Sequence, residues 1–328
     1  MSMRFKLLGF LCTCHVLAVD NTMESYVGYK VYRFTPSTED HIKLLRELQD
    51  AGIDFWTGPS PPGRTSDAMF SPEQQVDLLN KALSSGMKNE VYISDVQDLL
   101  DVEKVRTVQA PGEIDWYYYY KLDDLYAHVE RLAVENPYVE VIKYGQSYES
   151  RDLKVVKISK FCETGETKPI IFIEGSTHAR EWISSAVATY IINELLCGTL
   201  QERMDQFDFY IVPVGNPDGY VYSHTRSRMW RKTRSINKGS RCVGTDPNRN
   251  WNYQWMTGGS SDDPCTDIYA GPEAFSEVEI RSLAEFYQTI GNNVSFVLTL
   301  HIYGQKIVFP LGYTRDHIPD YDRYVRLA

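Results

Sequence analysis

The chain has 328 residues, of which 43% are hydrophobic and 24% are charged, a composition typical of folded globular proteins and long enough for two domains. Its 34 basic and 44 acidic side chains give a formal net charge of -10 and a pI of about 5.3. An acidic chain of this kind is not drawn by its bulk charge to nucleic acid or to an anionic membrane, so we expect no partner of either class.

A secretory signal peptide is predicted at the N-terminus. Arg4 and Lys6 precede an apolar run at residues 7–19, which is too short to span a bilayer comfortably and contains a small-residue cleavage site at 16–18. We therefore expect a signal peptide at residues 1–18 and a secreted, extracellular product that has no membrane-spanning segment.

The next 80 residues predict a small α+β domain with the order βαββαβ. Strands are expected at residues 29–34, 53–56, 66–70 and 90–93, and helices at 40–50 and 73–83. The helices are predicted by apolar side chains that recur on one face, namely Ile42, Leu45 and Leu48 in the first and Val76, Leu79 and Leu83 in the second. This order favours a ferredoxin-like open sandwich, and the polar segment 97–115 that follows is interpreted as a connector.

From Trp116 onward the pattern predicts an α/β domain, with a mixed, largely parallel sheet between helices. Strands are expected at residues 139–144, 153–158, 170–174, 209–214, 296–300 and 306–309. Helices are expected at 180–196 and 276–290, and the second opens with Ser276 and Glu279 in the spacing of a capping box. The four tyrosines at 117–120 are interpreted as packing residues.

Cysteine usage fits an oxidising compartment. Four cysteines remain after the signal peptide, namely Cys162, Cys197, Cys242 and Cys265, and they allow three pairings. The sequence favours Cys242 with Cys265, because both lie in a loop rich in Gly, Ser, Asn and Asp, and it leaves the other two undecided. Asn293 begins a glycosylation sequon, and the sequence does not settle whether it is used.

Two histidines stand where ligand sites of α/β sheets form. His178 and His301 each follow the C-terminal end of a predicted strand, and Glu181 lies three residues after His178. Two imidazoles and one carboxylate make a His₂Glu zinc set with a fourth position for water. On spacing alone this signal is weak, because a lone histidine at a strand end is more often structural.

A second group of residues is basic. Five cations fall within nine residues, namely Arg226, Arg228, Arg231, Lys232 and Arg234, and the segment 246–251 (DPNRNW) follows. A solvated basic loop is the simpler interpretation of most of them. A planar guanidinium is nevertheless the natural bidentate partner of a carboxylate, so a hydrolase that recognises a chain end would use such a clamp beside its metal.

Five motifs together resemble the secreted zinc carboxypeptidases of the carboxypeptidase A and B type, as proenzymes. They are HAREWI at 178–183, NPDGY at 216–220, RMWRKTRS at 228–235, DPNRNW at 246–251 and LTLH at 298–301. Residues 54–56 (DFW) and 93–97 (ISDVQ) also resemble the family's activation segment, so the resemblance runs from about Tyr29 to the end.

The resemblance implies the precursor of an exopeptidase that hydrolyses C-terminal residues from peptides and proteins. It implies an activation prosegment at 19–106 and a zinc carboxypeptidase catalytic domain at 107–328, in a protein expected to be a monomer. Lys104 and Arg106 in the connector are the expected cutting sites of a trypsin-like activating protease.

Residue roles are implied by the same resemblance. His178, Glu181 and His301 would bind one zinc ion, and Arg231 would polarise the scissile carbonyl and stabilise the oxyanion. The remaining positions are Asn248 and Arg249, which would hold the substrate's terminal carboxylate, Arg180 and Tyr303, which would line neighbouring subsites, and Cys242 and Cys265, which match the family's loop disulfide.

The sequence departs from the family in two respects. Ile302 follows the last zinc ligand where relatives often carry Ser. The family's catalytic glutamate, mobile tyrosine and pocket-floor residue lie beyond the position of Ala328, so none is assigned, and we expect the chain to be C-terminally incomplete. An A-like or B-like preference is therefore not readable, and the alternative is a noncatalytic zinc- and peptide-binding relative that lacks the general base.

Overall fold

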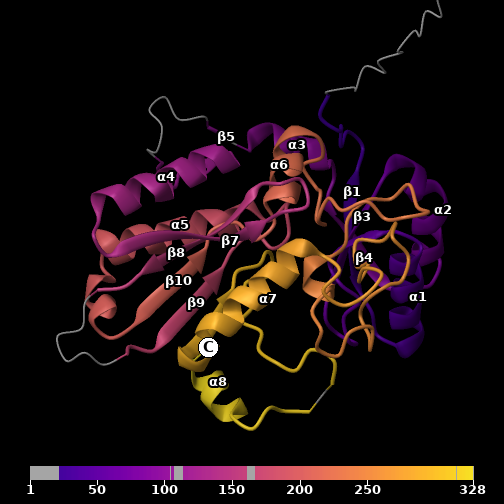
Figure 1. Cartoon of the computed structure of the whole chain (residues 1–328). Helices are drawn as coiled ribbons and strands as arrows, with labels where there is room; N and C mark the ends of the chain where they lie inside the picture. Colours follow the sequence, from indigo (N-terminus) through magenta and orange to yellow (C-terminus); the bar gives the residue numbers. More distant parts are fainter. Residues whose placement is uncertain (1–21, 104, 107–113, 161–166, 315, 328) are drawn as a thin grey trace, which may run out of the picture.

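The computed structural model of the chain describes residues 22–103, 105–106, 114–160, 167–314 and 316–327. These residues form an N-terminal unit around a four-stranded sheet and a C-terminal unit around a five-stranded sheet, and the two units lie side by side (Figure 1). The predicted signal peptide, Lys104 and Cys162 lie outside the described residues. No helix in the described ranges is long and apolar enough to cross a membrane.

The N-terminal unit has the βαββαβ order that the sequence predicts. Its elements are β1 (Lys30–Thr35), α1 (Glu39–Asp50), β2 (Asp54–Thr57), β3 (Ser66–Phe70), α2 (Pro72–Leu83) and β4 (Lys88–Ile93). The sheet order is β2-β3-β1-β4, and all three pairings are antiparallel. The helices begin where the sequence supplies caps, because Thr38 caps α1 and Ser71 forms a capping box with Gln74 in α2.

The two helices differ in how well their buried faces were predicted. Ile42, Leu45 and Leu48 of α1 are all buried, as predicted. The face predicted for α2 is right only at Leu79, which is buried; Val76 is 66% exposed, and α2 packs through Ala82 in its place. Leu83 is exposed as well, at 38%. Ala82 is too small to mark a face by hydrophobic spacing, so the pattern pointed to a neighbouring stripe of the helix.

The predicted connector contains regular structure. Helix α3 (Val96–Val102) is capped by Asp95, and β5 (Val105–Arg106) pairs in parallel with β6 (Tyr119–Tyr120). The interpretation of this region as a plain connector is therefore wrong at its start, while residues 107–113 lie outside the described part of the chain. A two-turn helix and a two-residue strand are too short for periodicity to detect.

The C-terminal unit is the predicted α/β domain. Its elements are α4 (Leu122–Glu135), β7 (Val139–Gln146), β8 (Asp152–Ile158), β9 (Ile170–Glu174), α5 (Trp182–Leu196), β10 (Asp208–Val212), α6 (Pro217–Thr225), α7 (Val278–Ile290), β11 (Val294–Thr299) and α8 (Tyr321–Leu327), with single 3₁₀ turns at 201–205, 247–249 and 291–293. The sheet order is β11-β9-β10-β8-β7, with β11, β9 and β10 mutually parallel and the other two pairings antiparallel. The mixed sheet is confirmed, with half of its pairings parallel.

Two local expectations for this unit are wrong. Residues 306–309 form no strand, and Ile307 and Val308 are exposed. Ser276 does not cap α7, because the helix begins at Val278 and the Ser276 hydroxyl instead meets the side chains of Asn250 and Glu277. A capping box is a local pattern, and here a long-range hydrogen bond from Asn250 and a contact with the adjacent Glu277 outcompete it.

Alternation along β9 fixes where the helices lie. Ile173 packs with Ala188 and Ile192 of α5 on one face, whereas Phe172 contacts Tyr287 of α7 on the other. Figure 1 shows α4 and α5 covering one face of the sheet and α7 the opposite face. The C-terminal end of β9 therefore leads through a short buried turn directly into α5, and this turn carries two of the predicted metal ligands, His178 and Glu181.

The favoured disulfide is present. Cys242 and Cys265 are bonded, with their Cα atoms 5.1 Å apart, and they tie two ends of a loop with little regular structure. Cys197 is an exposed free thiol. The loop that carries the segment 246–251 is thus covalently closed beside the sheet.

Glu279 of α7 generates a prediction about pH. Its carboxylate is 1% exposed and accepts a hydrogen bond from the Tyr148 amide at 2.9 Å, while its second oxygen has no partner among the described residues. Burial raises the pKa of Glu279 to about 7. The folded protein therefore holds a proton that the unfolded chain releases above about pH 4.5, and the free energy of unfolding falls as pH rises to 7.

Denaturant unfolding between pH 5 and 8 tests this prediction. The Glu279→Gln variant should lose a pH-dependent difference of up to about 3 kcal/mol relative to wild type. Glu285→Gln, on the exposed side of the same helix, is the matched control and should keep the wild-type slope. An unchanged slope in the Glu279 variant would show that this carboxyl is ionised throughout.

Candidate metal centre and binding cleft

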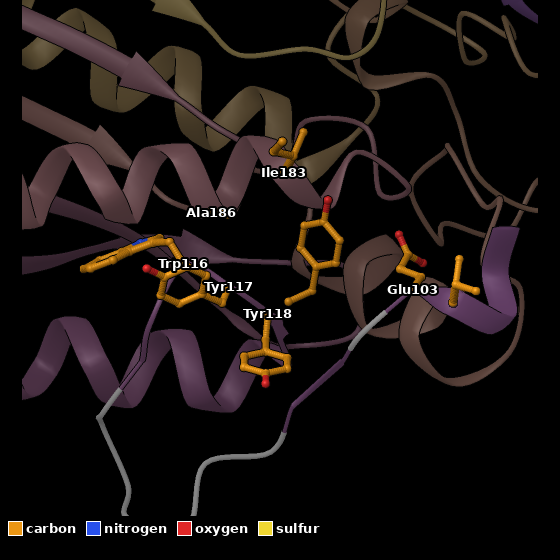
Figure 2. Close-up of a pocket in the computed structure, with 8 residues that line it drawn as sticks. Glu103, Trp116, Tyr117, Tyr118, Ile183 and Ala186 are labelled. Carbon is orange, nitrogen blue, oxygen red and sulfur yellow. The ribbon is translucent and has the colours of Figure 1, made fainter.

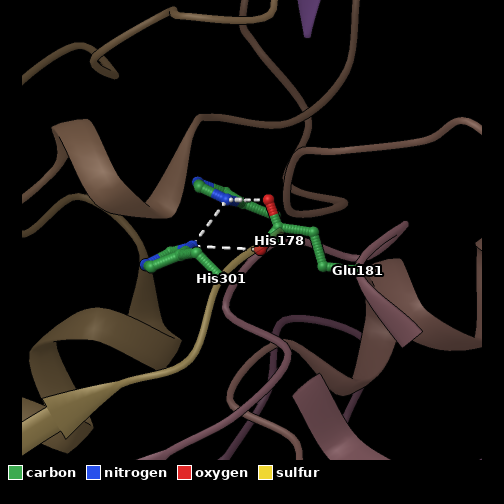
Figure 3. Close-up of side chains that lie close together, drawn as sticks. All are labelled: His178, Glu181 and His301. Atoms are coloured by element: carbon green, nitrogen blue, oxygen red, sulfur yellow. Dashed lines mark hydrogen bonds and ion pairs between the residues drawn. The ribbon is translucent and has the colours of Figure 1, made fainter. Parts of the chain in front are cut away.

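Three predicted ligands converge at the C-terminal edge of the sheet. His178 and Glu181 lie in the turn between β9 and α5, and His301 follows β11, which is the parallel neighbour of β9. One ligand atom from each lies within 4.8 Å of the others, as Figure 3 shows. Residues 120 positions apart are thus brought together as the sequence predicts, because parallel strands end at the same edge.

The donor geometry fits a tetrahedral metal ion. The Nδ1 atom of His178 lies 2.8 Å from one Glu181 oxygen, the Nδ1 atom of His301 lies 3.0 Å from the other, and the two nitrogens are 3.2 Å apart. Zinc with ligands at about 2.0–2.1 Å places its donors about 3.3 Å from one another. Two imidazole nitrogens and a carboxylate that face a common point are a donor set that zinc prefers.

Asp246 connects the metal centre to the basic loop. One of its oxygens lies 3.1 Å from the Nε2 atom of His178, and the other accepts a hydrogen bond from Arg231 at 2.8 Å. The Asp246 side chain is fully buried, so it fixes both partners. A carboxylate on the far nitrogen of a metal-binding histidine orients the ring and raises its basicity as a ligand.

The charges in this centre are mutually compensated. Burial alone would raise the pKa of Glu181, but His178 and His301 outweigh it and hold that pKa well below the ordinary range. Burial also opposes ionisation of Asp246, and Arg231 with His178 holds its pKa well below normal. Both carboxylates are therefore ionised at neutral pH, and the centre favours a cation.

The segment that carries Asn248 and Arg249 is held by hydrogen bonds to the neighbouring loop. Asn250 is fully buried, and its side-chain amide donates to the carbonyls of Ala270 and Glu273. Arg249 donates to the carbonyl of Gly259 at 2.6 Å. Both clamp residues line a cavity of about 490 Å³, and Arg249 shares with Arg231 a second cavity of about 180 Å³.

The N-terminal unit covers the cleft. Asp54 of β2 accepts two hydrogen bonds from Arg180, at 2.7 and 2.9 Å, and Asp67 of β3 accepts one from the Tyr303 hydroxyl. The Trp56 ring meets Tyr303 edge to face, and both line a cavity of about 250 Å³ beside Glu181. Both predicted subsite residues are thus held by the other unit.

A further contact holds the end of α3. Glu103 forms a forked ion pair with Arg228, whose guanidinium also stacks on the Trp182 ring at 3.5 Å. A cavity of about 400 Å³ lies next to this contact, between α3, the start of the C-terminal unit and α5 (Figure 2). Tyr117 at its rim is 88% exposed while Tyr120 is buried, so the tyrosine run packs only in part.

The sequence predictions and the geometry agree for the centre but not for its supports. The structure joins His178, Glu181, His301 and Arg231 in one cluster and places Arg180, Tyr303, Asn248 and Arg249 along the adjoining cavities. The sequence assigns no role to Asp246, Asp67, Glu103 or Asp267. Their contacts join residues at least 15 positions apart, which no local spacing reveals.

Comparisons with known proteins agree with this geometry. Residues 125–328 match the family described as zinc carboxypeptidase, and residues 32–103 match the carboxypeptidase activation peptide. The chain is 39% identical to zinc carboxypeptidase A 1 of Drosophila melanogaster and 37% identical to carboxypeptidase A2 of Rattus norvegicus, covering 96% and 93% of this chain and 75% of each relative.

Solved structures give the same result. The crystal structure of the carboxypeptidase A from Helicoverpa armigera matches with a TM-score of 0.84 at 27% identity, covering 92% of this chain and 76% of that one. Thrombin activatable fibrinolysis inhibitor matches with a TM-score of 0.79 at 29% identity, covering 90% and 76%. The chain therefore belongs to the zinc carboxypeptidase family and carries that family's activation peptide.

Proposed function

We propose that this chain is the secreted precursor of a zinc-dependent exopeptidase that removes C-terminal residues from peptides and proteins. The observation that carries the proposal is the convergence of His178, Glu181 and His301 beside Arg231. The relatives named above are carboxypeptidases, so the noncatalytic alternative is not favoured. Secretion, a monomeric state and the domain limits 1–18, 19–106 and 107–328 are parts of the same proposal.

His178, Glu181 and His301 would hold one zinc ion. When bound, zinc supplies a Lewis acid for a carbonyl oxygen and lowers the pKa of a bound water. Arg231 would place its guanidinium against the oxygen that gains negative charge, and Asp246 keeps that side chain in position through its 2.8 Å hydrogen bond. A donor fixed before the reaction stabilises this charge without reorganisation.

Recognition of the chain end would belong to Asn248 and Arg249. A guanidinium is a planar, permanently charged partner for a terminal carboxylate, and Arg249 stands between two cavities that could receive the last residue. Arg180 and Tyr303 would contact the residues that precede it. A clamp on a terminal carboxylate is what restricts a peptidase to chain ends.

Zymogen control would follow from the contacts of the activation peptide. Asp54 and Asp67 occupy Arg180 and Tyr303, so a substrate cannot reach them until the N-terminal unit leaves. A trypsin-like protease would cut after Lys104 or Arg106, in the segment between the two matched family regions.

The metal assignment predicts one zinc per chain. His178→Ala removes one of three protein ligands and should leave almost no zinc after dialysis against a weak chelator. Asp246→Asn should weaken zinc binding by about 10–100-fold, because it removes the orienting partner of His178. His317→Ala, an exposed histidine elsewhere, is the control for metal analysis. Full zinc in the His178 variant would refute the assignment.

The clamp assignment predicts that binding depends on a free C-terminus. After trypsin treatment, peptides with a terminal carboxylate should bind far more tightly than their amides. Arg249→Ala should remove about 2–5 kcal/mol of that preference without loss of zinc. Arg241→Ala, at an exposed arginine directly before the disulfide-closed loop, should have no effect. Equal binding of the free-acid and amidated peptides would show that the basic loop is only a solvated surface.

The activation model predicts limited proteolysis. Mild trypsin should yield a discrete fragment that begins near residue 107, detected by mass spectrometry, together with an intact N-terminal unit. The unit resists cutting because most of its basic side chains lie on paired strands and packed helices, with Arg64 in the exposed loop between β2 and β3 as the exception. Cleavage scattered through residues 30–93 would contradict a compact, separable activation peptide.

A further inference from the structure

Two carboxylates from opposite units share one guanidinium in the cleft. Arg180 donates two hydrogen bonds to Asp54, at 2.7 and 2.9 Å, and makes one longer contact of 3.4 Å with Asp267 of the C-terminal unit. The carboxyl groups of Asp54 and Asp267 thus lie beside the same guanidinium. Two ionised carboxylates so placed repel each other, which favours a proton on one of the two.

The surrounding charges decide where that proton lies. Asp54 takes both arms of Arg180 and also feels Arg231, so despite its burial its pKa is lowered. Asp267 keeps only the longer contact, with Arg231 and Lys232 as its other charged neighbours. Burial and the charge of Asp54 together raise the pKa of Asp267 to about 6. Asp267 is thus the carboxyl that takes up a proton when Asp54 docks.

We propose that Asp267 is a specificity-determining residue of the Arg180 subsite, which disfavours every acidic group that binds there until Asp267 itself is protonated. The first such group is the chain's own Asp54. For substrates the inference rests on the proposed function, because it takes Arg180 to be a peptide-binding residue. An acidic side chain at this subsite then gains less from Arg180 than it would gain without Asp267.

The sign of the pH dependence follows directly. Asp267 holds a proton while the activation peptide is docked and gives it up when the peptide has left. Docking of the activation peptide therefore weakens as pH rises through about 6. Asp54 stays ionised above pH 5 in both states and adds no dependence there. The Asp267 side chain keeps 37% of its surface exposed, so solvent screens the repulsion. Two pKa units would give a hundredfold effect only across the whole titration, and between pH 5.5 and 7.5 we expect a change of at most about fourfold.

Retention of the cut activation peptide is the first test. Zinc-loaded precursor is nicked with trypsin, and the half-life of the complex is followed by gel filtration at pH 5.5 and 7.5. Wild type should release the peptide up to about fourfold faster at pH 7.5, the change that a pKa of about 6 allows between these two values. Asp267→Asn, which mimics the protonated residue, should release it slowly at both values. Asp262→Asn, an exposed carboxylate in the same loop, should behave as wild type.

A second variant approaches the pair from the other unit. Asp54→Asn loses an ion pair, so it should release the peptide faster overall, but without the pH dependence. The inference is overturned if Asp267→Asn keeps the wild-type pH dependence. It is equally overturned if that variant releases the peptide faster at both pH values, since Asp267 would then merely hold Arg180 in place.

Peptide binding tests the substrate arm. Pairs of short peptides with a free C-terminus carry Asp or Asn at one of the three positions before the last residue. At one position Asp267→Asn should strengthen binding of the Asp peptide relative to its Asn partner by about tenfold at pH 7.5. An unchanged ratio of the two affinities would overturn the substrate arm. Failure of every peptide to bind would overturn the proposed function, whereas the release experiment is judged independently.

Discussion

The parallel pairing of β9 with β11 is the constraint on which the site depends. In this register Thr299 lies opposite Glu174, and the amide of Leu300 donates to the carbonyl of Glu174 at 2.8 Å. His301 is therefore delivered to the turn that carries His178 and Glu181, although the chain makes a long excursion between them. A shift of one residue along β11 would turn His301 to the other face of the sheet, so that it could no longer bind a metal ion together with His178 and Glu181.

The basic residues of the cleft follow from a second constraint, which is that a buried cation needs a partner. Arg231 lies on Asp246, Arg180 on Asp54 and Arg228 on Glu103. Only the first of these partners belongs to the C-terminal unit, so the other two arginines are satisfied by the activation peptide. Removal of that peptide leaves guanidinium groups facing the cleft, where a substrate's carbonyl and carboxylate oxygens can replace the lost acceptors.

The sequence pattern predicted the architecture well, because α1 buries a face that helical spacing describes directly and β9 is a short continuous apolar run, as expected of a strand covered on both faces. It failed where a long-range contact decides. Ser276 bonds to Asn250 instead of capping α7, and α2 turns Ala82 to the core in place of Val76. The metal ligands were found because motifs carry them, whereas the role of Asp246 became readable only when the fold placed it between His178 and Arg231.

An activation peptide must hold the cleft firmly and yet leave after a single cut. The contact between Asp54 and Arg180 is a bidentate, largely buried ion pair, the kind of contact that dissociates slowly. Asp267 opposes it from the enzyme's side without breaking its geometry. Arg180, which we propose also contacts the substrate, cannot be replaced by a weaker cation without weakening substrate binding. A second carboxylate beside it, Asp267, limits how tightly any acidic group binds while Arg180 is kept. The cleft can then keep a strong cation for recognition while its own inhibitor remains removable.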